Sequence, residues 1–397
     1  MKKSLALIVI VILISIFPRL WELNKYPPVV VDEPAYLRDI DKMVQNNNFY
    51  PADFQWDGSQ ATFVYIPTII LNKLFISDSL LALRTSSVIA GLLALIPFFL
   101  LVKRNTNDTV AFSTTLLFSF SYYFLQFSRV GWGVVWATTL GLYLIWVIEN
   151  LKNKNDFLKV SIAGLFAALT FYTYRAGEIY IVAASIYLTQ RILISKELFM
   201  KRVTKIVLFF LIFLTISSPW IIKINSNPDF FNLRSRVVSI QNVDKPYQGL
   251  YKDIDILKYQ ITTSFKSWIF FLPSDKGNHE TPRYLPKGYP TVNPLITVLF
   301  LAGVVIALIN LKRYYIWFFI YISGVIFGQI LTVYPPNGAR GLIILPIVYL
   351  FSSLSLFYIY KEFSKYRFIG HILVLISFIM AFLDFYFYTQ WMTWIKV

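Results

Sequence analysis

The run LALIVIVILISIF at residues 5–17, preceded by Lys2 and Lys3, decides the class of fold. It is followed by PRLW at residues 18–21 rather than by the small residues of a signal-peptide cleavage site, so we interpret it as a retained membrane span. Apolar runs of similar character recur along the chain, and about twenty such residues cross a hydrocarbon core roughly 30 Å thick. The sequence therefore predicts an all-α polytopic membrane protein.

The composition supports this interpretation. Hydrophobic residues make up 57% of the chain and charged residues 15%, whereas a soluble domain carries roughly 25% charged residues. The net charge of +16 does not indicate nucleic-acid binding, because the basic residues lie in short loops between apolar runs, as the positive-inside rule describes. The absence of cysteine excludes disulfides and thiolate metal sites.

About eleven membrane spans are predicted, together forming one integral membrane domain over residues 1–397 with no separate soluble C-terminal domain. Their approximate limits are 4–20, 85–102, 110–127, 134–148, 158–171, 179–191, 206–222, 294–309, 315–333, 342–360 and 368–388.

The segment at residues 61–76 leaves the topology open, because a sixteen-residue helix reaches only about 24 Å. If it lies on the membrane surface, the basic loops that follow it fall on the cytoplasmic side; if it crosses, they move outside. The positive-inside rule favours the first arrangement. We therefore predict a cell-membrane protein with a cytoplasmic N-terminus and two long exterior segments, at residues 21–84 and 223–293.

The most informative exterior stretch is PPVVVDEPAYLR at residues 27–38. Its two prolines keep the approach extended, and Pro34 after Glu33 suits the first turn of a helix, where an acidic side chain also complements the helix dipole. Apolar residues at helical spacing follow, which predicts a helix on the membrane surface. From spacing alone, capping by Glu33 beside a solvated Asp32 is the alternative to a chemical role.

An Asp-Glu pair just after the first span, followed by a surface helix, resembles the GT-C superfamily of glycosyltransferases, in particular the branch of protein O-mannosyltransferases and lipid A aminoarabinose transferases. The resemblance extends over most of the chain. Its other pieces are RLW at 19–21, Leu83-Arg84, Ser128-Arg129, FYTYR at 171–175, Asn278-His279, Leu285-Pro286, and Arg340 with Pro346. It implies transfer of a hexose or pentose from a polyprenyl-phosphate donor to an exterior lipid, polysaccharide or protein. It also implies that Asp32 is the catalytic base and that Glu33 helps to bind a divalent cation.

Three exterior arginines are candidates for the donor phosphate: Arg129, Arg175 and Arg340, each in a short turn. Guanidinium groups suit phosphate because they donate bidentate hydrogen bonds; the alternative is that each side chain snorkels to the membrane interface. Direct attack with a single carboxylate base would invert the anomeric carbon, whereas a retaining enzyme needs a second carboxylate as nucleophile.

Three further residues are candidates for metal or substrate contact. His279, beside Glu280, is a possible metal or substrate contact, and a solvated loop histidine is the alternative. Tyr172 and Tyr174 are possible stacking partners for sugar or prenyl chain, although interfacial aromatic residues look the same. A divalent cation is thus a possible cofactor, with Glu33 and His279 as ligands. The chain has no glycine-rich phosphate loop of the nucleotide type, so we expect no nucleotide cofactor.

A transporter or flippase for a lipid-linked sugar is the main alternative function. Such proteins place their charged sites near the bilayer midplane, often between repeated halves. Here the candidate residues gather on one predicted side, which favours an enzyme.

Overall fold

The computed structural model describes residues 2–29, 32–45, 65–151, 156–195, 197–229, 239–240, 253–273, 286, 288–332, 335–366 and 368–394. Throughout these ranges the chain forms helices and no β-strand, apart from a single bridge between Ser239 and Thr332. The predicted all-α fold is confirmed.

The helices begin and end close to the predicted spans, each of which falls on one or more of them. The first half contains α1 (Lys2–Leu20), α2 (Asp32–Gln45), α3 (Tyr65–Leu74), α4 (Ser79–Asn105), α5 (Asp108–Phe120), α6 (Tyr122–Phe127), α7 (Val134–Glu149), α8 (Phe157–Phe171), the 3₁₀ turn η1 (Arg175–Gly177), α9 (Glu178–Ile194) and α10 (Phe199–Ser226). The second half contains α12 (Asp253–Trp268), α14 (Pro294–Ile309), α15 (Leu311–Val325), the π-helix η3 (Ile326–Ile330), α16 (Gly338–Gly341), the 3₁₀ turn η4 (Leu342–Ile344), α17 (Leu345–Glu362) and α18 (Ile369–Trp394).

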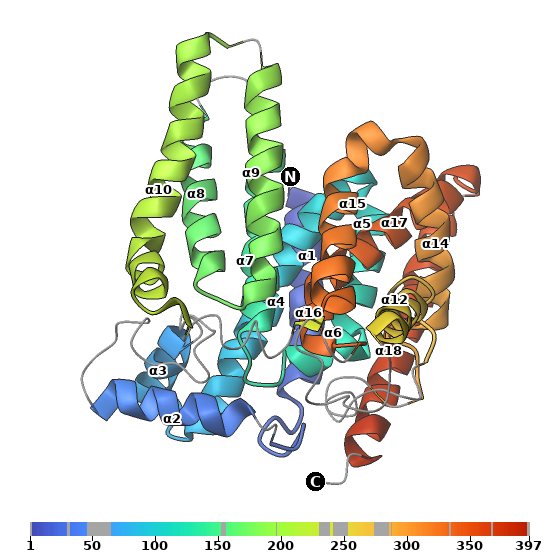
Figure 1. Cartoon of the computed structure of the whole chain (residues 1–397). Helices are drawn as coiled ribbons and strands as arrows, with labels where there is room; N and C mark the ends of the chain where they lie inside the picture. Colours follow the sequence, from blue (N-terminus) through green and yellow to red (C-terminus); the bar gives the residue numbers. More distant parts are fainter. Residues whose placement is uncertain are drawn as a thin grey trace.

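The long helices pack as a bundle with different faces turned outward (Figure 1). Most of α4 and α17 is buried, whereas α10 and α18 leave most of their apolar surface exposed. Apolar exposure of this kind suits contact with lipid rather than water. Six of the described helices are long and apolar enough to cross a membrane, and three shorter apolar helices accompany them.

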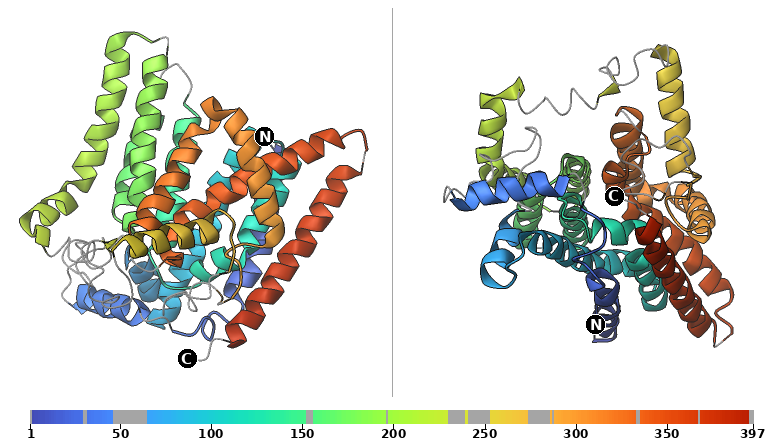
Figure 2. Two further views of the ribbon diagram at one scale, coloured as in Figure 1. Left: turned by 45° about the vertical axis from the view of Figure 1, so that its right-hand side comes forward. Right: turned by 90° about the horizontal axis from the view of Figure 1, so that it is seen from below.

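Helix α3 is ten residues long, and its length of about 15 Å is half of a hydrocarbon core. The described part of this helix is thus shorter than a membrane span. The first four residues of the segment at 61–76 lie outside the described ranges, and its surface position stays a prediction. Helices α2 and α3 lie together at the end of the bundle opposite the N-terminus, and α2 runs across that end (Figures 1 and 2).

Regular helical structure breaks down at this same end. The span predicted over 110–127 is divided at Ser121, whose ψ of 122° is not helical, into α5 and α6. Helix α15 ends as the π-helix η3, and α17 is preceded by the short elements α16 and η4. Departures of this kind, and π-bulges above all, are frequent at functional sites.

Candidate active site

Asp32 is the first residue of α2 and is partly exposed. The helix packs through a buried face that includes Tyr36, Asp39 and Met43, and the Tyr65 hydroxyl of α3 donates to Asp39 Oδ2 at 3.3 Å. Because α2 is anchored along this face, the Asp32 carboxylate is held at a fixed place where solvent or a substrate can reach it.

Glu33, the next residue, is fully buried and makes a bidentate ion pair. Arg84 of α4 donates from Nε to Oε1 at 2.8 Å and from Nη2 to Oε2 at 2.9 Å. The Gly131 N–H also donates to Oε1, at 2.9 Å, and Arg84 Nη1 donates to the Leu23 carbonyl at 3.0 Å. Charge-assisted, bidentate contacts of this kind are strong and directional. Glu33 therefore ties the start of α2 to α4 and to the turn after α6, a contact that goes beyond the predicted helix cap.

Arg129, in that turn, binds the backbone that leads from α1 to α2. Its guanidinium donates to the carbonyl of Pro18, to that of Trp21 at 2.5 Å and to that of Tyr26 at 2.9 Å. The same group lies 5.4 Å from the centre of the Tyr388 ring of α18. These contacts hold the segment between α1 and α2 in place, so the direct phosphate contact predicted for Arg129 has a structural alternative.

Three buried arginines lie in this part of the molecule. Arg19, Arg84 and Arg129 are all buried, and Arg19 donates to Ser119 Oγ at 2.9 Å. In the described part of the chain, the salt bridges of these three arginines involve one carboxylate, that of Glu33. Arg19 and Arg129 instead donate to carbonyl and hydroxyl oxygens of the protein.

Arg175 lies in η1 and is partly exposed. The preceding residue, Tyr174, packs edge-on against Trp132, with ring centres 5.8 Å apart. Trp132 directly follows Gly131, whose N–H binds Glu33. A short line of contacts therefore connects the turn that carries Arg175 to the start of α2.

Arg340 is partly exposed on α16, which is held by the π-helix. Asn337 caps α16 by accepting the Arg340 N–H on Oδ1 at 3.0 Å. The buried Gln329 side chain of η3 accepts the Asn337 N–H at 2.8 Å and donates to the Asn337 carbonyl at 3.0 Å. Two hydrogen bonds from one amide thus fix the turn that presents Arg340.

An aromatic row joins the two arginine turns. Tyr123 donates to the Gly338 carbonyl of α16, its ring lies 5.4 Å from Phe127, and Phe127 lies 6.0 Å from Trp132. Tyr123 also contacts Trp268 of α12, at 5.9 Å. The row places the three elements that carry Asp32, Arg175 and Arg340 around one end of the bundle, although they are far apart in sequence.

Sequence reasoning did not single out Tyr123, Trp268 or Gln329. Gln329 could have been found, because a polar side chain inside a predicted span is unusual and often functional. Tyr123 and Trp268 carried no such signal among the many aromatic residues of the chain.

The remaining candidates are two tyrosines and one histidine. Tyr172 faces α10, where its hydroxyl donates to the Ile216 carbonyl at 2.9 Å and its ring lies 6.5 Å from Trp220. Tyr174 packs on Trp132. His279 lies outside the described residues, and its substrate or metal contact stays a prediction.

The described residues do not form a metal site. No group of three or more His, Cys, Asp or Glu side chains occurs among them, and both carboxylate oxygens of Glu33 already accept hydrogen bonds from Arg84. The predicted metal role of Glu33 therefore has no support from the described part, and that of His279 stays a prediction.

Comparison with solved structures identifies the architecture. No family model and no curated protein matches the sequence. ArnT from Cupriavidus metallidurans in the apo state has a TM-score of 0.56 and 13% identity over 89% of this chain and 60% of that one. The same protein bound to undecaprenyl phosphate gives 0.54, with 13% identity over 89% and 59%.

The oligosaccharyltransferase of Archaeoglobus fulgidus, tethered to an acceptor peptide, gives a TM-score of 0.61 and 16% identity over 98% of this chain and 55% of that one. The chain thus spans a little over half the length of these structures. Both proteins are members of the GT-C superfamily. The chain has the fold of that superfamily.

Proposed function

We propose that the chain is a membrane glycosyltransferase that transfers a hexose or pentose from a polyprenyl-phosphate donor to an exterior acceptor, with Asp32 as general base. One observation carries the proposal: a partly exposed carboxylate at the start of a surface helix lies at the end of a GT-C fold where η1, α16 and the turn after α6 meet. The similar ArnT from Cupriavidus metallidurans binds undecaprenyl phosphate, which supports a donor of this class.

In the proposed reaction, the acceptor oxygen attacks the anomeric carbon while Asp32 accepts the hydroxyl proton. The bond between the anomeric carbon and the phosphate oxygen breaks, and polyprenyl phosphate leaves with the electron pair. With Asp32 as the one assigned carboxylate, the proposed reaction is a direct displacement with inversion, since retention requires a second carboxylate as nucleophile. A product with the anomeric configuration of its donor would overturn the inverting assignment.

We assign the phosphate to Arg175 and Arg340, because both are partly exposed on turns fixed by neighbouring elements. Cations placed where charge develops on a leaving group stabilise the transition state. Glu33, Arg84 and Arg129 act in this proposal as positioning residues that hold the first exterior segment and thereby Asp32. The gathering of these groups at one end, rather than near the bilayer midplane, supports an enzyme over a transporter.

The test compares two substitutions on one helix. Asp32→Asn removes the base and keeps the side-chain shape, whereas Asp41→Asn changes an exposed acid nine residues further along α2. With purified full-length protein and radiolabelled polyprenyl-phosphate sugars, we expect Asp32→Asn to lower the transfer rate about 10²- to 10⁴-fold, as for loss of a general base. Asp41→Asn should keep the wild-type rate. Full activity of Asp32→Asn would refute the assignment.

A further inference from the structure

A groove lies on the outer side of α9, in the half remote from the candidate active site. Its volume is about 600 Å³, and it is lined by the apolar side chains of Ile186, Leu193, Ile194 and Phe210 together with Ser185 and Thr189. The groove arises because α10 packs mainly on α8, which leaves this face of α9 uncovered. Its size and lining suit an extended hydrocarbon chain rather than a polar ligand.

Basic side chains border the end of this groove. Arg202, in the first turn of α10, donates to the carbonyl of the lining residue Leu193 at 2.8 Å. On the other side, Gln190 of α9 accepts a hydrogen bond from Tyr315 of α15. Lys312 is exposed three residues before Tyr315 and therefore lies on the same face of α15. Lys201 is exposed next to Arg202.

The described acids next to the groove are already paired. Glu149 binds Arg104 at 3.0 Å and Arg191 at 3.5 Å, and Glu197 accepts from Lys205 at 2.6 Å and 2.7 Å. Asp156 binds Lys159 at 2.8 Å. Within the described residues, no salt bridge involves Lys201, Arg202 or Lys312, so positive charge at the groove end is left for another anion.

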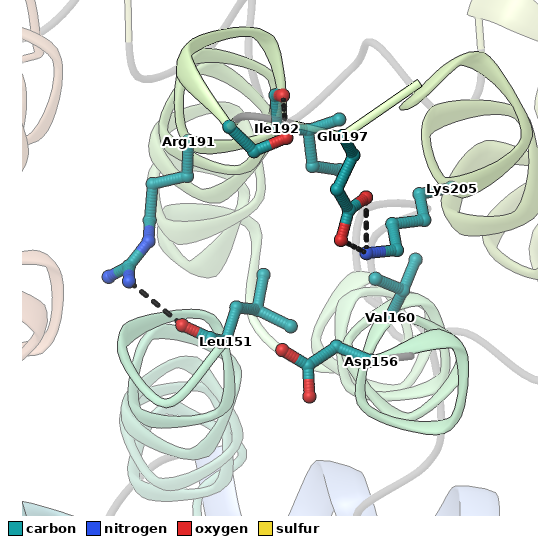
Figure 3. A pocket seen from close by; sticks show the side chains of 8 residues that line it. Leu151, Asp156, Val160, Arg191, Ile192, Glu197 and Lys205 are labelled. Atoms are coloured by element: carbon teal, nitrogen blue, oxygen red, sulfur yellow. Dashed lines mark hydrogen bonds and ion pairs between the residues drawn. The ribbon is translucent and has the colours of Figure 1, made fainter. Parts of the chain in front are cut away.

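The small cavity behind the groove is not that anion's site. Asp156, Arg191, Glu197 and Lys205 line it (Figure 3), and its volume is about 20 Å³. A space of this size holds about one water molecule, and the Glu197–Lys205 pair closes it. An anion with an apolar tail must therefore lie on the outer surface.

We infer that the groove on α9 binds an anionic phospholipid, with an acyl chain along Ile186, Leu193 and Phe210 and the phosphate near Lys201, Arg202 and Lys312. Basic pockets between membrane helices are suited to lipid headgroups. The donor substrate is not the occupant, because Gln190 lies twelve residues beyond the first residue of α9, about 18 Å along the helix, and the candidate site is at the other end. The inference is independent of the proposed function.

The test titrates purified full-length protein with phosphatidylglycerol, phosphatidylcholine of the same acyl chains, or undecaprenyl phosphate, and follows bound lipid by native mass spectrometry. We expect phosphatidylglycerol to bind most tightly. The Lys201→Gln/Lys312→Gln variant should bind phosphatidylglycerol about fivefold more weakly for each lysine removed. Its affinity for phosphatidylcholine should stay unchanged. Thr189→Trp, which fills the groove, should weaken the binding of both phospholipids.

A matched control keeps the same charge loss at another position. Lys361 and Lys365 are exposed at the far end of α17, and the Lys361→Gln/Lys365→Gln variant should bind phosphatidylglycerol as the wild type does. Equal binding of the two phospholipids, an equal loss in the control, or tighter undecaprenyl phosphate binding that Thr189→Trp weakens would each overturn the inference. If Thr189→Trp fails to fold, Ser185→Leu replaces it.

Discussion

At the scale of single residues, Asp32 and Glu33 are neighbours with opposite environments. Asp32 is partly exposed, whereas Glu33 is fully buried against Arg84 and Gly131. The position of the pair after the first span was predictable from local sequence. The burial of Glu33 was not, because its partners lie 51 and 98 residues away and nothing in local spacing reports them.

Glu33→Gln should destabilise the protein strongly, because it leaves Arg84 buried without a counter-charge. Breaking a buried ion pair from one side costs about 3–5 kcal/mol. Thermal or denaturant unfolding in detergent measures the loss. The double variant Glu33→Leu/Arg84→Met should lose less than the sum of the single variants Glu33→Leu and Arg84→Met, since neither charge remains.

One result would contradict the positioning role of Glu33. If Glu33→Gln unfolds like the wild type and its activity returns with excess divalent cation, Glu33 is a metal ligand rather than a positioning residue.

At the scale of elements, the site depends on breaks in helices that hydrophobic periodicity does not reveal. The predicted spans at 110–127 and 315–333 are both predominantly apolar, yet one is divided at Ser121 and the other ends as a π-helix. Tyr123, just after the first break, donates to Gly338, 215 residues away, and Gln329 of the π-helix binds Asn337, eight residues away. Local propensity therefore predicted where the helices lie but not where they break.

Gly341→Ala tests how closely α16 packs on α12. A Cβ at Gly341 would come 1.9 Å from Trp268 Cη2, and Trp268 is fully buried. Overpacking of this kind costs about 1–3 kcal/mol, so we expect a lower melting temperature and weaker donor binding through the displaced Arg340. Gly370→Ala in α18, where the Cβ meets only ordinary contacts at 3.7 Å, is the control and should match or exceed wild-type stability.

At the scale of the whole molecule, the orientation in the membrane is predicted from the charge of the loops and the lengths of the helices. The end with α2 and α3 lies opposite the N-terminus (Figure 1), and the basic loops lie at the N-terminal end. If these loops are cytoplasmic, as the sequence predicts, the candidate site lies on the exterior side.

The lack of cysteine in the chain makes this orientation directly measurable. In intact cells, a membrane-impermeant maleimide should label the Lys25→Cys variant but not the Lys201→Cys variant; both positions are exposed. After permeabilisation both should react. Labelling of both variants in intact cells would mean that the segment at 61–76 crosses the membrane.

The Glu33–Arg84–Gly131 contact also sets an order for biogenesis. The ribosome synthesises Glu33 before its two partners, which follow 51 residues later (Arg84) and 98 residues later (Gly131). The Glu33 carboxylate therefore stays solvated until α4 and the turn after α6 have been inserted. We expect maleimide reactivity at Asp32→Cys to stay high in nascent chains stalled before residue 131 and to fall in longer ones. Unchanged reactivity would argue against this order. The candidate base is thus synthesised well before its supporting contacts can form, so a chain interrupted before Gly131 carries Asp32 without its working position.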